Sequence, residues 1–208
     1  MAKIKLNDVR LSFPNLWAAK EFKPGDGKFR YDATFLIEPG SENDKKIRDA
    51  IKAAGEETWG AKGEKTLRAI EGQANKYAYQ DGDLKEYDGY EGMWFLACHS
   101  KVRPLVIDRR PKLPDGSPNI LTEADGKPYA GCYVNATVEI YAQKGENPGL
   151  RASFAGVQFV RDGDAFGGGS AAKAEDFDDL GDSSDDDLGT RNSPFSRRYL
   201  DSSDDDLV

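Results

Sequence analysis

Residues 29–37, FRYDATFLI, alternate strictly between apolar and polar side chains. The apolar set is Phe29, Tyr31, Ala33, Phe35 and Ile37. Successive side chains of a β-strand point to opposite faces, so this period of two predicts a strand with one face packed on a core. Any fold for this chain must therefore supply a sheet with one buried face.

Four further stretches are expected to be strands. In Ile4–Phe13 the apolar spacing changes from two to three between Leu6 and Val9, which predicts a β-bulge, and Pro14 is expected to end the pairing. The other three strands are expected over residues 93–102, 132–143 and 150–160. The last two are joined by the turn-rich KGENPG, which predicts an antiparallel hairpin.

Two helices are expected after the second strand. Ser41 is placed as an N-cap, because Glu42 and Asp44 follow in the first turn, where the helix dipole favours anions. Apolar residues then recur at helical spacing, and Gly55 is expected to stop the helix. A second, shorter helix is expected over residues 64–70.

Two long segments are expected to be irregular. Residues 77–92 are polar and rich in glycine, and they are expected to form a long loop or a poor hairpin with four exposed tyrosines. Residues 103–131 form a basic connection that is punctuated by prolines. Because there is no βαβ rhythm, the fold class expected is mainly β: a five-stranded Greek-key barrel with inserted helices and long loops. A two-sheet sandwich is the alternative.

The charge is divided unevenly along the chain. Residues 1–165 hold 25 Lys and Arg against 25 Asp and Glu, whereas residues 166–208 hold 4 against 12. The whole formal charge of −8 therefore belongs to the last part of the chain. Such asymmetry is typical of an interaction tail on a globular domain. We expect a folded domain over residues 1–165 and, over 166–208, a flexible Gly/Ala linker followed by an acidic disordered tail.

The acidic tail contains the string DSSDDDL twice, at Asp182–Leu188 and Asp201–Leu207. A mobile acidic peptide with a few apolar residues can mimic a polyanion, compete with DNA for a basic groove, and present apolar anchors to a partner protein. The plain alternative is a solubility-enhancing end. The duplication favours neither, since a repeat also arises as a recombination scar.

Nothing in the chain indicates catalysis or a bound metal. His99 is the single histidine and is expected to be structural, and with Cys98 and Cys132 it supplies too few ligands for zinc. No nucleophile–base set or phosphate-binding glycine motif is present. We therefore expect no enzyme activity and no cofactor. The lack of a signal sequence or of an apolar stretch of about 20 residues predicts a cytoplasmic protein without membrane contact.

Basic and aromatic residues are interleaved outside the predicted core. This combination is typical of single-stranded nucleic-acid binding, because cations follow the phosphates and flat rings stack on bases. Bases are expected to stack on Trp17, Tyr77, Tyr79 and Trp94. Phosphates are expected to contact Lys23, Arg30, Lys101, Arg103, Arg109, Arg110 and Lys112.

Three stretches resemble a bacteriophage family: LSFPNLW (11–17), PYAGCYVNATVEIYAQ (128–143) and GVQFVRDGDAFGGG (156–169), followed by an acidic end. The family is that of phage-encoded single-stranded DNA-binding proteins. The resemblance implies an OB-fold, cooperative and sequence-independent binding of single-stranded DNA as an oligomer or filament, and roles in phage DNA replication or recombination in the cytoplasm of the infected bacterium. It fixes no individual contact residue.

The resemblance also implies that the tail recruits replication or recombination proteins. The residues expected to do so are Asp176, Phe177, Asp178, Asp179, Leu180, Asp185, Asp186, Asp187 and Leu188. This chain departs from the usual tail pattern because about 28 residues follow EDFDDL before the end at Leu207-Val208. A different class of function remains open, in which the acidic tail mimics DNA and inhibits a host nuclease or polymerase.

Overall fold

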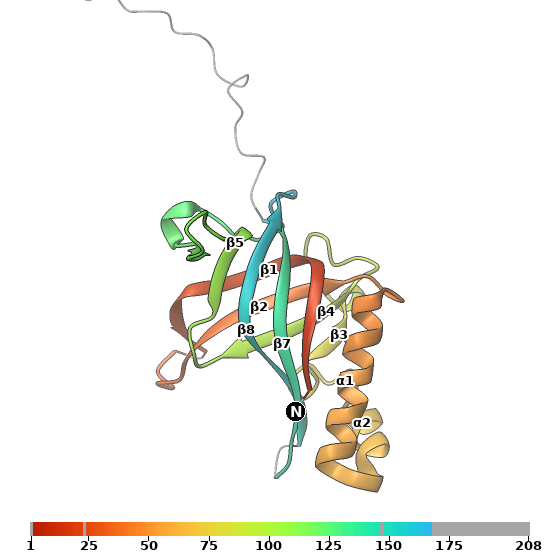
Figure 1. The fold of residues 1–208 in the computed structure, drawn as a ribbon. Coiled ribbons are helices and arrows are strands. Elements are labelled where there is room, and N and C mark those ends of the chain that lie inside the picture. The colour runs from red at the N-terminus through yellow and green to blue at the C-terminus, as the bar shows by residue number, and fades with distance from the viewer. Residues whose placement is uncertain (1, 23, 146–147, 168–208) are drawn as a thin grey trace, which may run out of the picture. The chain divides into compact units, whose positions relative to one another are not determined.

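The computed structural model describes residues 2–22, 24–145 and 148–167. Its eight strands form one sheet in the order β3-β4-β2-β1-β7-β8-β5-β6 (Figure 1). The strands are β1 (Ala2–Glu21), β2 (Phe29–Ile37), β3 (Tyr79–Asp81), β4 (Trp94–Ser100), β5 (Leu105–Lys112), β6 (Pro118–Ile120), β7 (Tyr133–Gln143) and β8 (Gly149–Arg161). The mainly β fold class is confirmed, and β7 and β8 pair as the expected antiparallel hairpin. The five predicted strands correspond to β1, β2, β4, β7 and β8.

Among these five strands, β4 and β8 are the outer two in the sheet order. Two other segments, one before β4 and one after it in the chain, connect β4 to β8. The first segment is residues 77–81. Its β3 part pairs with β4, and Tyr77, just before β3, forms a β-bridge with Leu150 of β8. Farther along the chain, β5 follows β4 directly and pairs in parallel with residues 156–158 of β8. The sheet therefore curls around its core, where residues such as Leu11, Phe35 and Ile140 are buried.

The first strand is longer than expected. The bulge between Leu6 and Val9 is confirmed by a register shift against β7. The prediction that Pro14 ends the pairing is wrong, because Asn15 lies opposite Asp32 and the pairing continues to Glu21. Pro14 falls inside a second register shift, where the missing N–H of proline interrupts no ladder bond.

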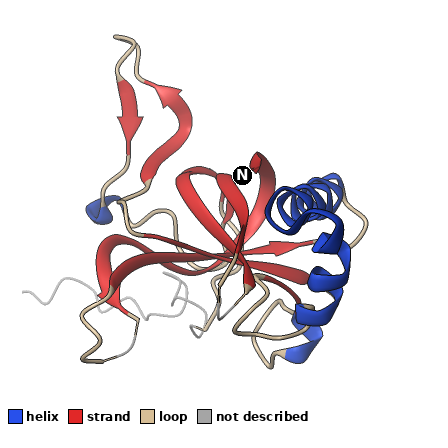
Figure 2. Cartoon of the chain, turned by 90° about the horizontal axis from the view of Figure 1, so that it is seen from below, coloured by secondary structure: helices blue, strands red, loops and turns tan. Residues whose placement is uncertain are grey.

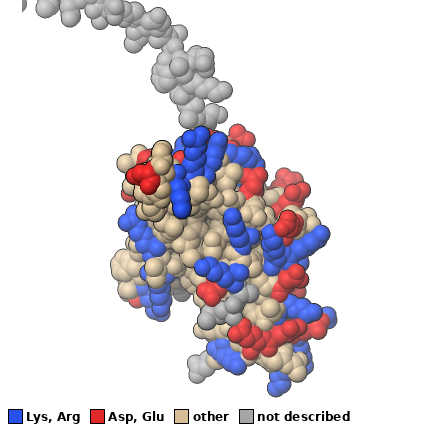
Figure 3. All heavy atoms as spheres, in the orientation of Figure 1, with Lys and Arg blue, Asp and Glu red and all other residues tan. Residues whose placement is uncertain are grey.

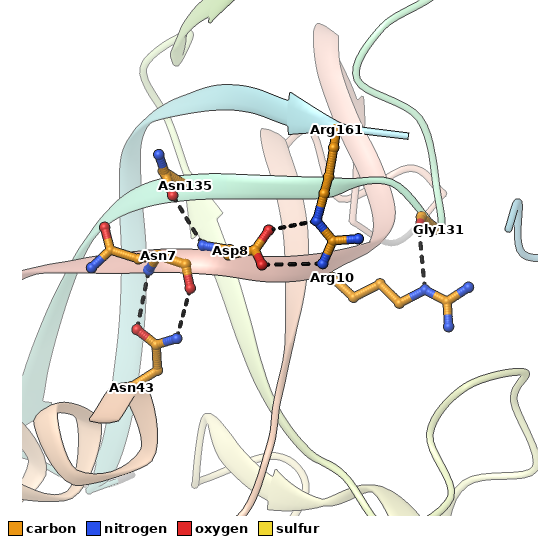
Figure 4. Close-up of polar contacts among 7 residues, drawn as sticks. All are labelled: Asn7, Asp8, Arg10, Asn43, Gly131, Asn135 and Arg161. Atoms are coloured by element: carbon orange, nitrogen blue, oxygen red, sulfur yellow. Dashed lines mark hydrogen bonds and ion pairs between the residues drawn. The ribbon is translucent and has the colours of Figure 1, made fainter. Parts of the chain in front are cut away.

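A polar network holds the first bulge in place (Figure 4). Asp8 has a positive φ of 49°, and its carboxylate accepts two hydrogen bonds of 3.1 Å from the Arg161 guanidinium. Its backbone N–H donates to Asn135, while Asn7 and Asn43 exchange two hydrogen bonds. The bulge thereby ties β1 to β7, to β8 and to the start of the first helix.

Two helices, α1 (Glu42–Trp59) and α2 (Gly63–Ile70), lie together on one side of the sheet (Figure 1). Ser41 is the N-cap, as expected, and its side chain accepts from Asp44 N–H at 3.2 Å. The prediction that Gly55 stops α1 is wrong. Gly55 lies within the helix, and a Cβ there would be 2.6 Å from Leu67 of α2, so this glycine allows the two helices to pack closely. No helix in the described ranges is long and apolar enough to cross a membrane.

Residues 77–92 are not the exposed loop that was expected. They contain β3 and a 3-10 turn over Gly82–Leu84, and they bury Tyr77, Tyr79 and Tyr90, leaving Tyr87 exposed. The basic connection over residues 103–131 also contains structure, namely β5 and β6. The start of β5 pairs with β8, whereas its far end projects with β6 from the sheet as an arm, with the 3-10 turn Glu123–Asp125 near its base (Figure 2).

Candidate nucleic-acid interface

A groove runs over the outer face of β2 and β4 and reaches β8. We call it the outer groove. Its lining comprises Phe22, Arg30, Ala74, Asn75, Tyr77, Ala78, Gln80, Ala97, His99, Leu150, Arg151 and Ala152. The groove therefore combines one exposed aromatic ring, that of Phe22, with two arginines, a histidine and several small residues.

Strand register explains why these side chains face outward. Ala33, Phe35 and Ile37 of β2 point into the core, so Arg30 and Asp32 point away from it. Asp32 lies directly opposite His99 on β4. In β8 the buried Leu150 and Ala152 flank Arg151, which places the arginine on the outer face as well.

Phe22 and Arg30 form a pair at one end of the outer groove. The Arg30 guanidinium carbon lies 3.8 Å from the centre of the Phe22 ring, and Arg30 Nε lies 2.7 Å from Asp32 Oδ1. The loop beside them is held by Glu21, whose carboxylate accepts from the N–H groups of Gly25 and Gly27, both at 2.9 Å. Arg30 stands at the start of β2, hydrogen bonds to Glu21 hold the segment before β2, and Phe22 remains 54% exposed.

The electrostatics of the outer groove are positive around His99. Partial burial lowers the pKa of His99, and the charges of Arg30, Arg151 and Lys101 lower it further. Asp32 is the acidic neighbour, and burial raises the pKa of its carboxyl while Arg30 opposes that rise. Three cations acting on one imidazole indicate a field that attracts anions to this face.

Two of the four residues expected to stack on bases are buried in this structure. Tyr77 is 7% and Tyr79 is 1% exposed, so neither offers a ring face to a base. Burial is also the main reason why the pKa of Tyr77 rises to about 12. Trp17 and Trp94 are partly buried against the main core, and neither belongs to the outer groove.

Tyr79 instead completes a polar cluster beneath α1. Its hydroxyl donates to Asp44 Oδ1 at 2.7 Å, and the same carboxylate accepts from Arg48 Nε at 2.7 Å and from Gly40 N–H at 2.8 Å. Burial of Asp44 raises the pKa of its carboxyl, but these hydrogen bonds outweigh that effect and the net pKa is lowered. The Trp94 ring packs on Tyr79 with centroids 5.2 Å apart. The cluster fastens α1 to β3 and β4.

Replacing Tyr79 by phenylalanine should therefore reduce stability without reducing ligand affinity. The substitution removes one hydrogen bond to a charged group, and we expect a loss of about 1–3 kcal/mol in the free energy of unfolding. Urea denaturation measures that loss, and titration with an oligonucleotide measures affinity. If the free energy of unfolding is unchanged and the affinity for the oligonucleotide clearly falls, Tyr79 contacts the DNA after all.

The predicted phosphate contacts fall in three places. Arg30 lines the outer groove, and Lys101 is close enough to lower the pKa of His99. Arg103 lines a separate hollow with residues of β7 and β8. Another hollow, on the β5–β6 arm, is lined by Arg109, Arg110 and Lys112. Lys23 and all the predicted tail residues lie outside the described residues.

On the face shown in Figure 3, Lys and Arg side chains alternate with Asp and Glu over α1 and α2 and gather at the upper end of the view. The body has no net charge, so local clustering, rather than total charge, indicates where an anion would bind.

Sequence reasoning did not select Arg151 and His99, which line the candidate interface, and did not select Phe22 for stacking. The period of two in β8 places Arg151 on the outer face, but sequence does not reveal that β8 lies beside β4. His99 was expected to be structural because the sequence offers too few further ligands for a metal site and no nucleophile that would pair with His99 as a base. Within the described ranges no three His, Cys, Asp or Glu side chains are grouped closely enough to hold a metal.

Comparison with known proteins gave concordant matches. The profile of the family described as "Enterobacter phage Enc34, ssDNA-binding protein" matches residues 2–188. Protein p50 of Acyrthosiphon pisum secondary endosymbiont phage 1 is 50% identical over 181 residues, which cover 86% of this chain and 94% of p50.

Among solved structures, the fold resembles the single-stranded DNA-binding protein from bacteriophage Enc34 in complex with ssDNA. The TM-score is 0.62 at 22% identity, and the match covers 79% of this chain and 89% of that chain. A second structure of the single-stranded DNA-binding protein from bacteriophage Enc34 gives a TM-score of 0.60 at 22% identity, and the match covers 85% of this chain and 90% of that chain. At this identity the likeness establishes a shared fold.

Proposed function

The chain belongs to the family of single-stranded DNA-binding proteins described from Enterobacter phage Enc34, and on that premise we propose that it binds single-stranded DNA through the outer groove. The observation that carries this proposal is that Arg30, His99 and Arg151 line one groove with the exposed Phe22 ring, and Lys101 is near enough to lower the pKa of His99. A bound strand would neutralise these cations, and the ring would stack on a base.

Strand connectivity supports an OB-fold. In such barrels, oligonucleotides bind on the face of the second and third strands, between the loop joining strands one and two and the loop joining strands four and five. The corresponding strands here are β2 and β4. Phe22 stands in the first of those loops, and Arg151 lies near the start of β8, just after the β7–β8 hairpin turn. The outer groove therefore coincides with the site that an OB-fold would use.

Binding would be insensitive to sequence. Arginine and lysine contact phosphates, which are the same at every nucleotide, and stacking on a flat ring accepts any base. In the proposed role the protein covers single strands during phage DNA replication or recombination, in the cytoplasm of the infected host.

We propose further that the acidic tail competes with DNA and recruits partner proteins. The last described residues pack against the segment that follows Tyr87: Gly167 N–H donates to Asp88 at 3.4 Å, and a Cβ on Gly89 would lie 2.6 Å from the Phe166 ring. Between that point and Leu188 the sequence carries 1 basic and 8 acidic residues. The family profile ends at Leu188, at the end of the first DSSDDDL copy, so we assign the proposed recruiting role to the segment before it.

Anisotropy of a labelled oligo-dT provides the test of binding. We expect saturable binding that weakens steeply with salt, because each phosphate contact releases a counterion. An RNA or duplex probe of the same length serves as the comparison. If the full chain and a version ending at Gly167 both fail to bind oligo-dT at low salt, the proposal fails, and the DNA-mimic function becomes the better account of the acidic tail.

The pH dependence of binding should report on His99. Phosphates that enter the outer groove would neutralise the cations that lower the pKa of His99, so that pKa should be higher in the complex than in the free protein. The complex then binds more protons, and affinity should rise as the pH falls from about 7 to 5. Because the chain has one histidine, His99→Gln should remove most of this dependence. An equal pH dependence in the variant would exclude His99 from the interface.

A further inference from the structure

Two exposed aromatic rings lie outside the outer groove and have no role in the proposal above. Phe13 is 55% and Tyr87 is 51% exposed, and their ring centroids are 5.1 Å apart in an edge-to-face arrangement. Phe13 also has a φ of 46°, which is unusual for a residue with a side chain. Unusual backbone conformations of this kind concentrate at ligand-binding positions, so the pair is a candidate for a function.

The rings of Phe13 and Tyr87 both pack on the buried ring of Tyr90. Tyr90 is 2% exposed, and its ring lies 6.5 Å from that of Phe13 and 5.4 Å from that of Tyr87. The Tyr90 hydroxyl donates to Ser12 Oγ at 3.2 Å, and the ring packs against Phe95. Phe13 and Tyr87 are therefore held in place from below while their outer surfaces face solvent.

Strand register places this pair beside the outer groove. Phe13 lies in β1 between Ser12, which is opposite Thr34, and Asn15, which is opposite Asp32. The Asn15 side chain donates to the Arg30 carbonyl at 3.2 Å, which links the bulge to the end of the groove. Asp32 is two residues from Arg30, a separation of about 7 Å along a strand. Phe13 therefore lies only a few residues from Arg30 across the β1–β2 pair.

We propose that Phe13 and Tyr87 form a second stacking subsite, which holds an unpaired base of the strand that occupies the outer groove. This inference rests on the proposed function and extends it from one ring to a track of two. Glu86 and Asp88 flank Tyr87, so this position repels phosphates and suits a neutral base. The sugar–phosphate chain would then pass on the β2 side, near Arg30.

Two probes distinguish a loss of base stacking from a loss of affinity caused by a disturbed fold. One probe is oligo-dT, and the other is an oligonucleotide of the same length made of abasic deoxyribose phosphates. The double variant Phe13→Leu/Tyr87→Leu keeps apolar bulk and removes both flat rings. We expect its affinity for oligo-dT to fall about 10-fold, within the range of stacking on one or two bases, and its affinity for the abasic probe to stay within about twofold.

Controls and a direct readout complete the test. Leu84→Ala removes an exposed apolar side chain from the same segment and should leave both affinities unchanged, and Phe13→Tyr should retain the oligo-dT affinity. Irradiation of wild-type protein bound to a 5-bromodeoxyuridine oligonucleotide should also cross-link the probe to Phe13 or Tyr87. The subsite would be overturned if the double variant lost affinity equally for both probes. It would also be overturned if the variant lost affinity for neither probe and the wild-type protein formed no cross-link to these residues. If the wild-type protein does not bind oligo-dT at all, the proposed function itself fails.

Discussion

Replacing Arg30, Lys101 and Arg151 together by glutamine is expected to weaken the binding of single-stranded DNA by about 500-fold at 50 mM salt. The figure follows from counterion release, in which each phosphate contact to a single strand contributes about 0.7 to the slope of log affinity against log salt. Loss of three contacts lowers the slope by about 2, so the defect should shrink to about 30-fold at 200 mM salt. The dependence on salt is therefore as informative as the loss itself.

A matched triple variant tests whether position matters. Lys52, Lys62 and Lys65 are exposed on and between α1 and α2, and replacing them by glutamine changes the total charge by the same amount. We expect this variant to keep nearly full affinity and an unchanged salt slope. Similar losses in the two triple variants would show that binding responds to net charge and that the outer groove has no special role.

Removal of residues 168–208 is expected to raise the affinity for single-stranded DNA about 10-fold at low salt. A covalently attached acidic segment competes with DNA at an effective concentration of order millimolar, and salt screens that competition. The acidic charge is unevenly placed within the tail. Residues 168–188 carry 1 basic and 8 acidic residues, whereas residues 189–208 carry 3 and 4.

A shorter truncation separates the two copies of DSSDDDL. A chain that ends at Leu188 keeps the strongly acidic part and should bind DNA with nearly the affinity of the full chain. Replacing the eight acidic residues of 168–188 by their amides in the full chain should reproduce the gain of the longer truncation. An equal gain from both truncations would assign the competition to the last twenty residues and contradict the role proposed for EDFDDL.

Five of the eight strands and the first helix could be predicted because each follows a local rule. Phe29–Ile37 alternates with a period of two, Ser41 precedes two acidic residues, and the spacing between Leu6 and Val9 requires an extra residue. These patterns depend on a few neighbouring side chains and on the geometry of the backbone. The resemblance to a family of phage DNA-binding proteins, based on three short stretches, is confirmed by a profile match that spans residues 2–188.

The binding surface was harder to predict because it depends on contacts between distant segments. Tyr79 stands in a polar, glycine-rich stretch that is typical of a loop, yet Asp44 and Trp94 enclose it from elsewhere in the chain. Phe29 continues the apolar alternation of its strand but is 59% exposed, since it lies at the strand end beyond the core. Arg151 joins the outer groove because β8 lies beside β4, a neighbour that local sequence does not specify.

Amide chemical shifts of the ¹⁵N-labelled protein during titration with oligo-dT test the central claim most directly. The account predicts that the largest changes fall on Arg30, Ala97, His99 and Arg151, whereas the amides of α1 and α2 stay nearly unchanged. Changes confined to the β5–β6 arm, or spread evenly over the surface, would contradict the assignment of the outer groove as the DNA-binding site.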